Sequence, residues 1–174
     1  QRNNSPGTIP SDTNEIIDIE WNAIDELERA ISENPNQIAC FISSPYHQPV
    51  LKDNVLPEDQ YWQKVESLCR QNGIVLIVDD VRAGFRINLA GSNEAYGFKP
   101  DLVCLGKAMG NGYPISALVG VDHLKKSAEA VYFTGTQFFN AAPMAAAKST
   151  LLELQKVDAV NKMEEFGNNL KSGL

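Results

Sequence analysis

Long apolar runs are missing from this 174-residue sequence. Its uninterrupted apolar segments end after about six residues, whereas a membrane-spanning helix needs ~20. The N-terminal residues also lack the charged and apolar pattern of a signal peptide. We therefore expect a soluble protein that has no membrane partner.

Basic residues are fewer than acidic ones. The sequence has 15 Lys and Arg against 22 Asp and Glu, which gives a formal net charge of −7. No stretch gathers the basic residues that a nucleic-acid groove requires. We expect small-molecule partners and no nucleic acid.

Cysteine and histidine are scarce, with three and two residues. Cys40, Cys69 and Cys104 lie far apart in apolar patterns, and none has a second cysteine or histidine at metal-ligand spacing. His47 and His123 are isolated and are expected to be loop or surface residues. We predict no metal site and three reduced cysteines in the core of a cytoplasmic protein.

Nucleotide-binding motifs are also missing. The sequence has neither a GxGxxG pattern after a strand nor a Walker pattern. Nicotinamide and nucleotide chemistry therefore have no motif on which to rest.

Apolar runs and helical patterns alternate along the chain. This order predicts an α/β fold with right-handed crossovers, a mostly parallel sheet and helices on both faces. The predicted strands are 38–42, 74–78, 102–105 and 115–121, and the predicted helices begin near Asn22, near Pro57 and at Ala141, the last continuing to Leu174.

A lysine stands at the end of one of these strands. Lys107 follows the apolar run 102–105 and precedes Gly110 and Gly112. At the end of a buried strand we expect its stem to be held in a cleft, where a desolvated amine can form a Schiff base. Taken alone, a lysine such as Lys107 is far more often a surface residue, and it is the strand end, the two glycines and the pairing with Asp79 that reverse this expectation.

A carboxylate occupies the equivalent place after another strand. Asp79 ends the run 74–78, and ligands of α/β sheets bind beyond the carboxyl ends of the strands. A Schiff-base lysine with an aspartate for a pyridinium nitrogen is the minimum equipment for pyridoxal 5'-phosphate. The alternative is that Asp79 only forms a turn or caps a helix.

These residues also carry a family resemblance. The stretch VLIVDDVRAGFR contains Asp79, and Lys107 follows it by 28 positions in LGKAMGNGYPISALVG. The pair resembles the class III aminotransferases of pyridoxal phosphate fold type I, and is most similar to the branch with glutamate semialdehyde aminomutase. The resemblance implies that residues 1–174 form part of a large cofactor-binding domain. We therefore expect an N-terminal segment and a C-terminal small domain to lie outside them.

The resemblance assigns roles to four residues. Lys107 would bind the cofactor as a Schiff base and carry the proton, and Asp79 would pair with the pyridine nitrogen. Val81 would pack on the cofactor ring, although an ordinary core valine would be buried similarly. Thr136, in a Thr-Gly-Thr stretch, would bind the cofactor phosphate across the interface of a homodimer with shared active sites.

Some positions depart from the family pattern. Asp80 stands where glutamate is usual, Ser44 where glutamate often precedes proline, and Phe138 and Phe139 where smaller residues are expected. Arg82 could meet a substrate carboxylate or be a solvated arginine.

The resemblance implies a transaminase that passes an amino group from a small-molecule donor to a keto or aldehyde acceptor. Two alternatives stay open at this level. One is an aminomutase of the glutamate semialdehyde type, in which both halves of the reaction occur on one molecule. The other is a catalytically silent relative with an assembly or regulatory role, in which the departures record lost activity.

Overall fold

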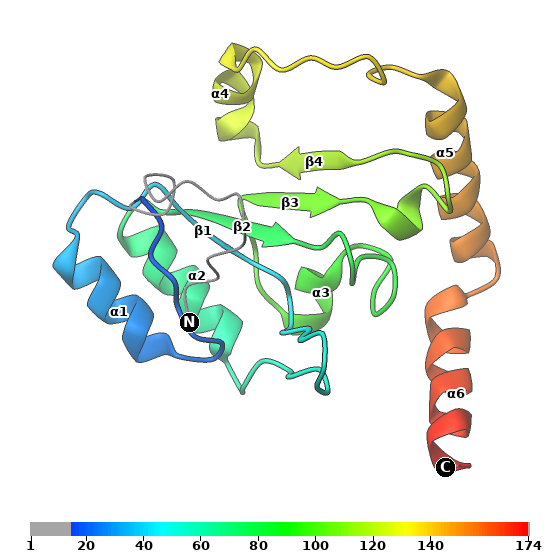
Figure 1. Cartoon of the computed structure of the whole chain (residues 1–174), viewed down its shortest axis with the longest axis horizontal. Helices are drawn as coiled ribbons and strands as arrows, with labels where there is room; N and C mark the ends of the chain where they lie inside the picture. The colour runs from blue at the N-terminus through cyan, green and yellow to red at the C-terminus, as the bar shows by residue number, and fades with distance from the viewer. Residues whose placement is uncertain (1–14, 174) are drawn as a thin grey trace.

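A four-stranded sheet forms the centre of the computed structural model, which describes residues 15–173 (Figure 1). The strands lie in the order β1-β2-β3-β4. The elements are α1 (Ile24–Glu33), β1 (Cys40–Ser43), α2 (Tyr61–Gln71), β2 (Val75–Asp79), α3 (Ser92–Tyr96), β3 (Leu102–Leu105), β4 (Ala117–Gly120), α4 (Lys125–Ala130), α5 (Ala141–Lys156) and α6 (Ala159–Ser172), with short 3-10 helices at Lys107–Met109 and Asp122–Leu124.

The sheet is mostly parallel, as the sequence predicts. β1 pairs with β2 and β2 with β3 in parallel, and only β4 runs antiparallel to its neighbour β3. The parallel pairing of β2 with β3 places Val78 opposite Val103 and Asp79 opposite Cys104. The carboxyl ends of β2 and β3 therefore meet at one edge of the sheet.

The two faces of the sheet differ in their cover. Leu76 and Val78 point into the core with α1 and α2, whereas on the other face Ile42 is 58% exposed and Leu118 is 60% exposed. Because β1, β2 and β3 follow one another in one direction, right-handed crossovers place α2 and α3 on the same side. Among residues 15–173, α1, α2 and α3 lie on this covered face, whereas α5 packs at the carboxyl end of the sheet.

The main core lies between that covered face and α1 and α2. Trp62 is 1% exposed and stacks on Phe98, with ring centroids 4.3 Å apart and planes 5° from parallel. Its indole Nε1 donates a hydrogen bond of 2.9 Å to the carbonyl oxygen of Pro45. Trp62 therefore joins α2 to the loop after β1 and to the segment before β3. The buried members of this core are Leu27, Tyr61, Trp62, Val65, Cys69, Ile74, Leu76, Val78 and Phe98.

A second, smaller core lies at the carboxyl end of the sheet. Phe85, Met109 and Ala147 are buried together, and Leu105 and Ala117 pack against them. Figure 1 shows α5, which carries Ala147, beyond the ends of β2 and β3. This core packs the turns after β2 and β3 against α5, which is distant from them in sequence.

Several predicted boundaries shift in the structure. Asn22 does not cap α1, whose N-cap is Ala23; the Asn22 side chain instead bonds to Leu56 and Glu58. The helix predicted from Ala141 to the end of the chain is interrupted, because Asp158 has a left-handed φ of 53° between α5 and α6.

The cysteines differ in environment, so the expectation of three core cysteines is wrong. Cys69 is buried, and burial raises the pKa of its thiol to about 12. Cys40 is exposed because it lies on the open face of β1, and Cys104 is half-buried. In the described part of the chain no group of His, Cys, Asp or Glu side chains could hold a metal ion. No helix there has the length and apolar character to span a bilayer.

We predict that Trp62→Ala lowers the free energy of unfolding by about 3–5 kcal/mol, since it leaves a cavity in the main core and removes the bond to Pro45. Urea denaturation would measure this loss. Lys64→Ala, an exposed change on the same helix, is the matched control and should alter stability by less than about 0.5 kcal/mol. Equal effects of the two changes would contradict the assignment of Trp62 to the core.

Candidate active site

Backbone register brings the two predicted catalytic residues to one edge of the sheet. Asp79 ends β2 opposite Cys104 of β3, and the N–H of Asp80 donates to the carbonyl oxygen of Cys104 at 3.0 Å. Lys107 follows Cys104 by three residues, so it emerges at the same edge. This is the place where α/β sheets bind their ligands.

Asp79 is half-buried at that edge. Its Oδ1 accepts a hydrogen bond of 3.2 Å from the backbone N–H of Val81, an Asx-type turn that directs the chain away from the strand. Asp79 therefore does form a turn after β2, as the alternative interpretation predicts. The Asp79 carboxylate nevertheless lies at the carboxyl end of the sheet, where it can also face a bound cation.

Asp80, which follows Asp79 in the chain, is buried. Its carboxylate accepts hydrogen bonds from the backbone N–H of Ser92 at 2.9 Å and from the Ser92 hydroxyl at 2.6 Å. Burial raises the pKa of the Asp80 carboxyl above its ordinary value, and the bonds from Ser92 act in the opposite direction. The sequence offers no signal for this pair, because an irregular loop separates its members.

Lys107 begins the short 3-10 helix with a left-handed φ of 41°. A lysine rarely adopts such a backbone, and residues held in this region cost of order 1–3 kcal/mol and gather at functional sites. The N–H of Gly110 donates to the carbonyl oxygen of Lys107 at 3.0 Å, and a Cβ on Gly110 would clash with the carbonyl oxygen of Tyr113. Glycine is therefore required to close this turn behind the lysine.

The side chain of Lys107 is exposed. The predicted cleft around its stem is not formed by the described residues, because no segment among 15–173 packs over it. The amine is consequently open to any group that approaches the edge of the sheet.

Val81 lies between the two turns. A Cβ placed on Gly106 would stand 3.4 Å from Cγ1 of Val81, so the valine methyl groups rest against the glycine that precedes Lys107. Val81 is half-buried. The structure thus brings Asp79, Val81 and Lys107 together.

Thr136 stands apart from these three residues. It lies in the exposed segment 131–140, which Figure 1 shows running beyond β4 between α4 and α5. Among the described residues no hydrogen bond joins Thr136 to Asp79 or Lys107. Its neighbours are aromatic: Phe133 and Phe138 contact each other with centroids 5.1 Å apart, and Phe139 is 85% exposed.

Arg82 and the loop after β1 lie near the same edge. Arg82 is exposed, and its Nη1 donates a long hydrogen bond of 3.4 Å to the backbone carbonyl of Gln48. Ser44, at the family's glutamate position, is half-buried, and its carbonyl accepts a bond of 3.2 Å from the Ser43 hydroxyl. The Arg82–Gln48 hydrogen bond connects the loops after β1 and β2 without assigning a role to Arg82.

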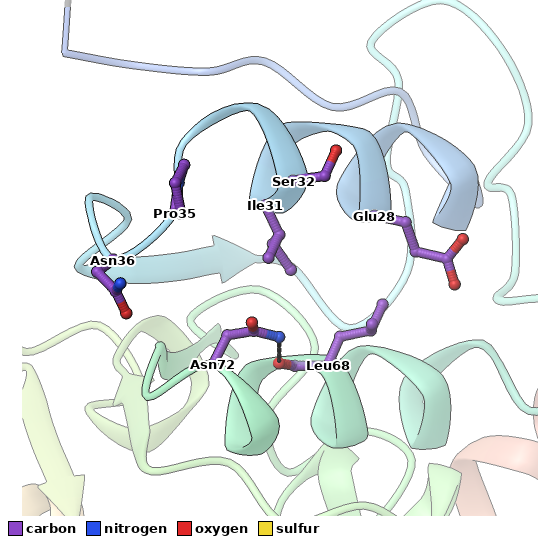
Figure 2. Close-up of a pocket in the computed structure, with 7 residues that line it drawn as sticks. All are labelled: Glu28, Ile31, Ser32, Pro35, Asn36, Leu68 and Asn72. Atoms are coloured by element: carbon purple, nitrogen blue, oxygen red, sulfur yellow. Dashed lines mark hydrogen bonds between the residues drawn. The ribbon is translucent and has the colours of Figure 1, made fainter.

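Two grooves among the described residues lie away from this edge of the sheet. One groove, with a volume of about 560 Å³, lies between α1 and α2 (Figure 2), and a second one of about 260 Å³ lies beside the start of α2. Neither is lined by Asp79, Val81, Lys107 or Thr136. The groove in Figure 2 is lined by Glu28, Ile31, Ser32, Pro35, Asn36, Leu68 and Asn72.

Comparison with known proteins identifies the family of the chain. Residues 5–174 match the family model Aminotransferase class-III. The chain is 34% identical over 168 residues to an aminopentol aminotransferase of Sphingopyxis macrogoltabida, covering 97% of this chain and 40% of that protein. It is 38% identical over 157 residues to a glutamate-1-semialdehyde 2,1-aminomutase of Methanococcus maripaludis, covering 87% of this chain and 36% of the relative. The chain thus spans about two fifths of the length of these relatives.

Solved structures give the same result. The FumI protein of Sphingopyxis sp. MTA144, in its pyridoxal phosphate internal aldimine form, superposes with a TM-score of 0.93 at 34% identity, covering 97% of this chain and 41% of that one. An acetylornithine aminotransferase of Elizabethkingia anophelis superposes with a TM-score of 0.80 at 25% identity, covering 90% and 39%. The chain therefore belongs to the class III aminotransferases, enzymes of fold type I that bind pyridoxal phosphate.

Proposed function

We propose that this chain is the central part of the large domain of a transaminase, which moves an amino group from a small-molecule donor to a keto or aldehyde acceptor. The observation that carries the proposal is the parallel pairing of β2 with β3, which brings Asp79 and Lys107 to one edge of the sheet. The match to class III aminotransferases supports the reaction class.

The residues at this edge fit pyridoxal phosphate. The donor set is a carboxylate at Asp79 and a primary amine at Lys107, which suit the ring nitrogen and the aldehyde of the cofactor. Gly106 lies against the methyl groups of Val81, so this wall is lined by backbone and small apolar groups that a flat ring can approach. When bound, the cofactor supplies an electron sink for the carbon that bears the substrate's amino group.

Each residue then has a defined task. Lys107 would bind the cofactor covalently through Nζ. Once the substrate amine has taken its place, Nζ would accept and return the proton that moves in the reaction. Asp79 holds the proton on the ring nitrogen, since a carboxylate stabilises a neighbouring positive charge. Val81 orients the ring through apolar contact.

A second copy of the chain completes the site in this proposal. Lys107 and Thr136 are both exposed, and Thr136 lies in a segment that exposes the aromatic side chains Phe133 and Phe139. We therefore assign Thr136 to the phosphate of the cofactor bound by the other subunit of a homodimer. The proposal includes a cytoplasmic location, on the basis of three separate free thiols.

An aminomutase is the second candidate, and one observation favours it. The relative with 38% identity is named a glutamate-1-semialdehyde 2,1-aminomutase. A transaminase requires a separate amino acceptor for turnover, whereas an aminomutase converts one substrate without it. Measuring turnover with and without added 2-oxo acid or aldehyde distinguishes the two reactions.

We predict that reduction of the intact protein with borohydride in the presence of pyridoxal phosphate fixes the cofactor on Lys107. Peptide mass mapping would locate the modified lysine. Lys107→Ala should remove this adduct and lower turnover by several orders of magnitude, because no other amine stands at this position. Lys99→Ala, an exposed lysine before the same strand, is the matched control. Full turnover by Lys107→Ala would refute the proposed function.

Asp79→Asn tests charge separately from shape. The amide keeps an oxygen for the N–H of Val81 but cannot hold a proton on the ring nitrogen. We expect cofactor to remain bound while the rate of proton removal from the substrate falls at least about 100-fold. Single-turnover absorbance kinetics would measure this rate. An unchanged rate would show that Asp79 only forms the turn after β2.

We further predict that subunits with different defects complement each other. Mixing Lys107→Ala subunits with Thr136→Ala subunits should form heterodimers in which one of two sites has both residues intact. Activity should recover when labelled subunits are shown to exchange. If exchange occurs between two disabled parents and no activity returns, Thr136 does not act across a subunit interface.

A further inference from the structure

The segment between β2 and α3 is closed by a buried pair of side chains. This segment, residues 81–91, begins with Val81, whose methyl groups rest on Gly106. Asp80 precedes it and Ser92 follows it, and two hydrogen bonds of 2.9 Å and 2.6 Å join them. The two ends of the segment are thus joined directly beside Asp79.

The Asp80–Ser92 pair is enclosed by protein. Asp80 is 1% exposed and Ser92 is 0% exposed. A carboxylate buried to this degree requires hydrogen-bond donors, and both of its oxygens receive one from Ser92. Few other arrangements of the segment could satisfy this carboxylate, so the pair holds the segment in one conformation.

The backbone of Asp80 also forms hydrogen bonds, one to β3 and one within the segment. Its N–H donates to the carbonyl oxygen of Cys104 at 3.0 Å, and its carbonyl oxygen accepts from the N–H of Gly84 at 2.7 Å. A Cβ on Gly84 would lie 2.7 Å from that carbonyl oxygen, so the chain turns back tightly over Asp80. Asp80 therefore connects β2, β3 and the first turn of the segment through hydrogen bonds.

We propose that Asp80 is a positioning residue, which acts through Ser92 to hold Asp79 and Val81 in their places against the cofactor. The inference rests on the proposed function, because it assigns Asp80 a task in cofactor binding. Its basis is the place of Asp80 in the chain, between the carboxylate and the apolar side chain that face the ligand.

Variants of the intact protein separate positioning from stability. Asp80→Asn keeps the shape and places an amide beside the N–H of Ser92, and Ser92→Ala removes only the hydroxyl donor. We expect Asp80→Asn to weaken pyridoxal phosphate binding about tenfold and Ser92→Ala to weaken it less, as lost buried hydrogen bonds imply. Equilibrium dialysis measures the dissociation constant. We expect the pH midpoint of the bound cofactor's absorbance change to fall in Asp80→Asn, because a negative charge near the cationic cofactor is lost.

Asp101→Asn is the matched control. Asp101 also accepts a backbone N–H through its carboxylate, from Leu76 at 2.8 Å, but it lies before β3 at the opposite end of the strand. Asp101→Asn should lower stability in urea and leave both the dissociation constant and the pH midpoint as in the wild type. Asp80→Glu, which keeps the charge, should stay closer to the wild type in the pH midpoint than Asp80→Asn.

Two results would overturn the inference and can be told apart. If the wild-type protein forms the borohydride-reduced adduct at Lys107 and Asp80→Asn changes only stability, as Asp101→Asn does, Asp80 has a purely structural role. If the wild-type protein forms no such adduct, the proposed function fails and the positioning role fails with it.

Discussion

The parallel pairing of β2 with β3 is the constraint on which the site depends. It aligns Asp79 with Cys104, so the carboxylate that ends one strand and the lysine that follows the other reach the same edge of the sheet. A slip of one residue would turn Asp79 to the opposite face, because side chains alternate along a strand. The bond from Asp80 N–H to the carbonyl of Cys104 continues this register beyond the last pair of the ladder.

Two separate cores maintain that register. The main core, with Trp62 stacked on Phe98, holds the covered face of the sheet against α1 and α2. The second core joins Phe85 after β2, Met109 after β3 and Ala147 of α5. The turns that carry the candidate catalytic residues are therefore supported from behind by apolar packing. The side chain of Lys107 is exposed, and that of Asp79 is half-buried.

The exposed surfaces of this chain lie where the proposed cofactor and the proposed second subunit would make contact. Lys107 is open to solvent, the segment around Thr136 presents Phe139, and one face of the sheet exposes Ile42 and Leu118. Apolar side chains of this size are more stable when covered. The relatives are more than twice as long as the part that this chain matches. In the proposed homodimer, a second copy of the chain would cover part of these surfaces.

Local apolar runs and motifs at a set spacing were enough to predict the strands, the mostly parallel α/β class and the family. The roles of Asp79, Lys107, Val81 and Thr136 remain predictions. The exposure of Cys40, the packing of α5 at the carboxyl end of the sheet and the hydrogen bonds from Ser92 to Asp80 emerge only in the folded chain. These outcomes depend on strand order and on partners brought together across an irregular loop, which no local pattern encodes.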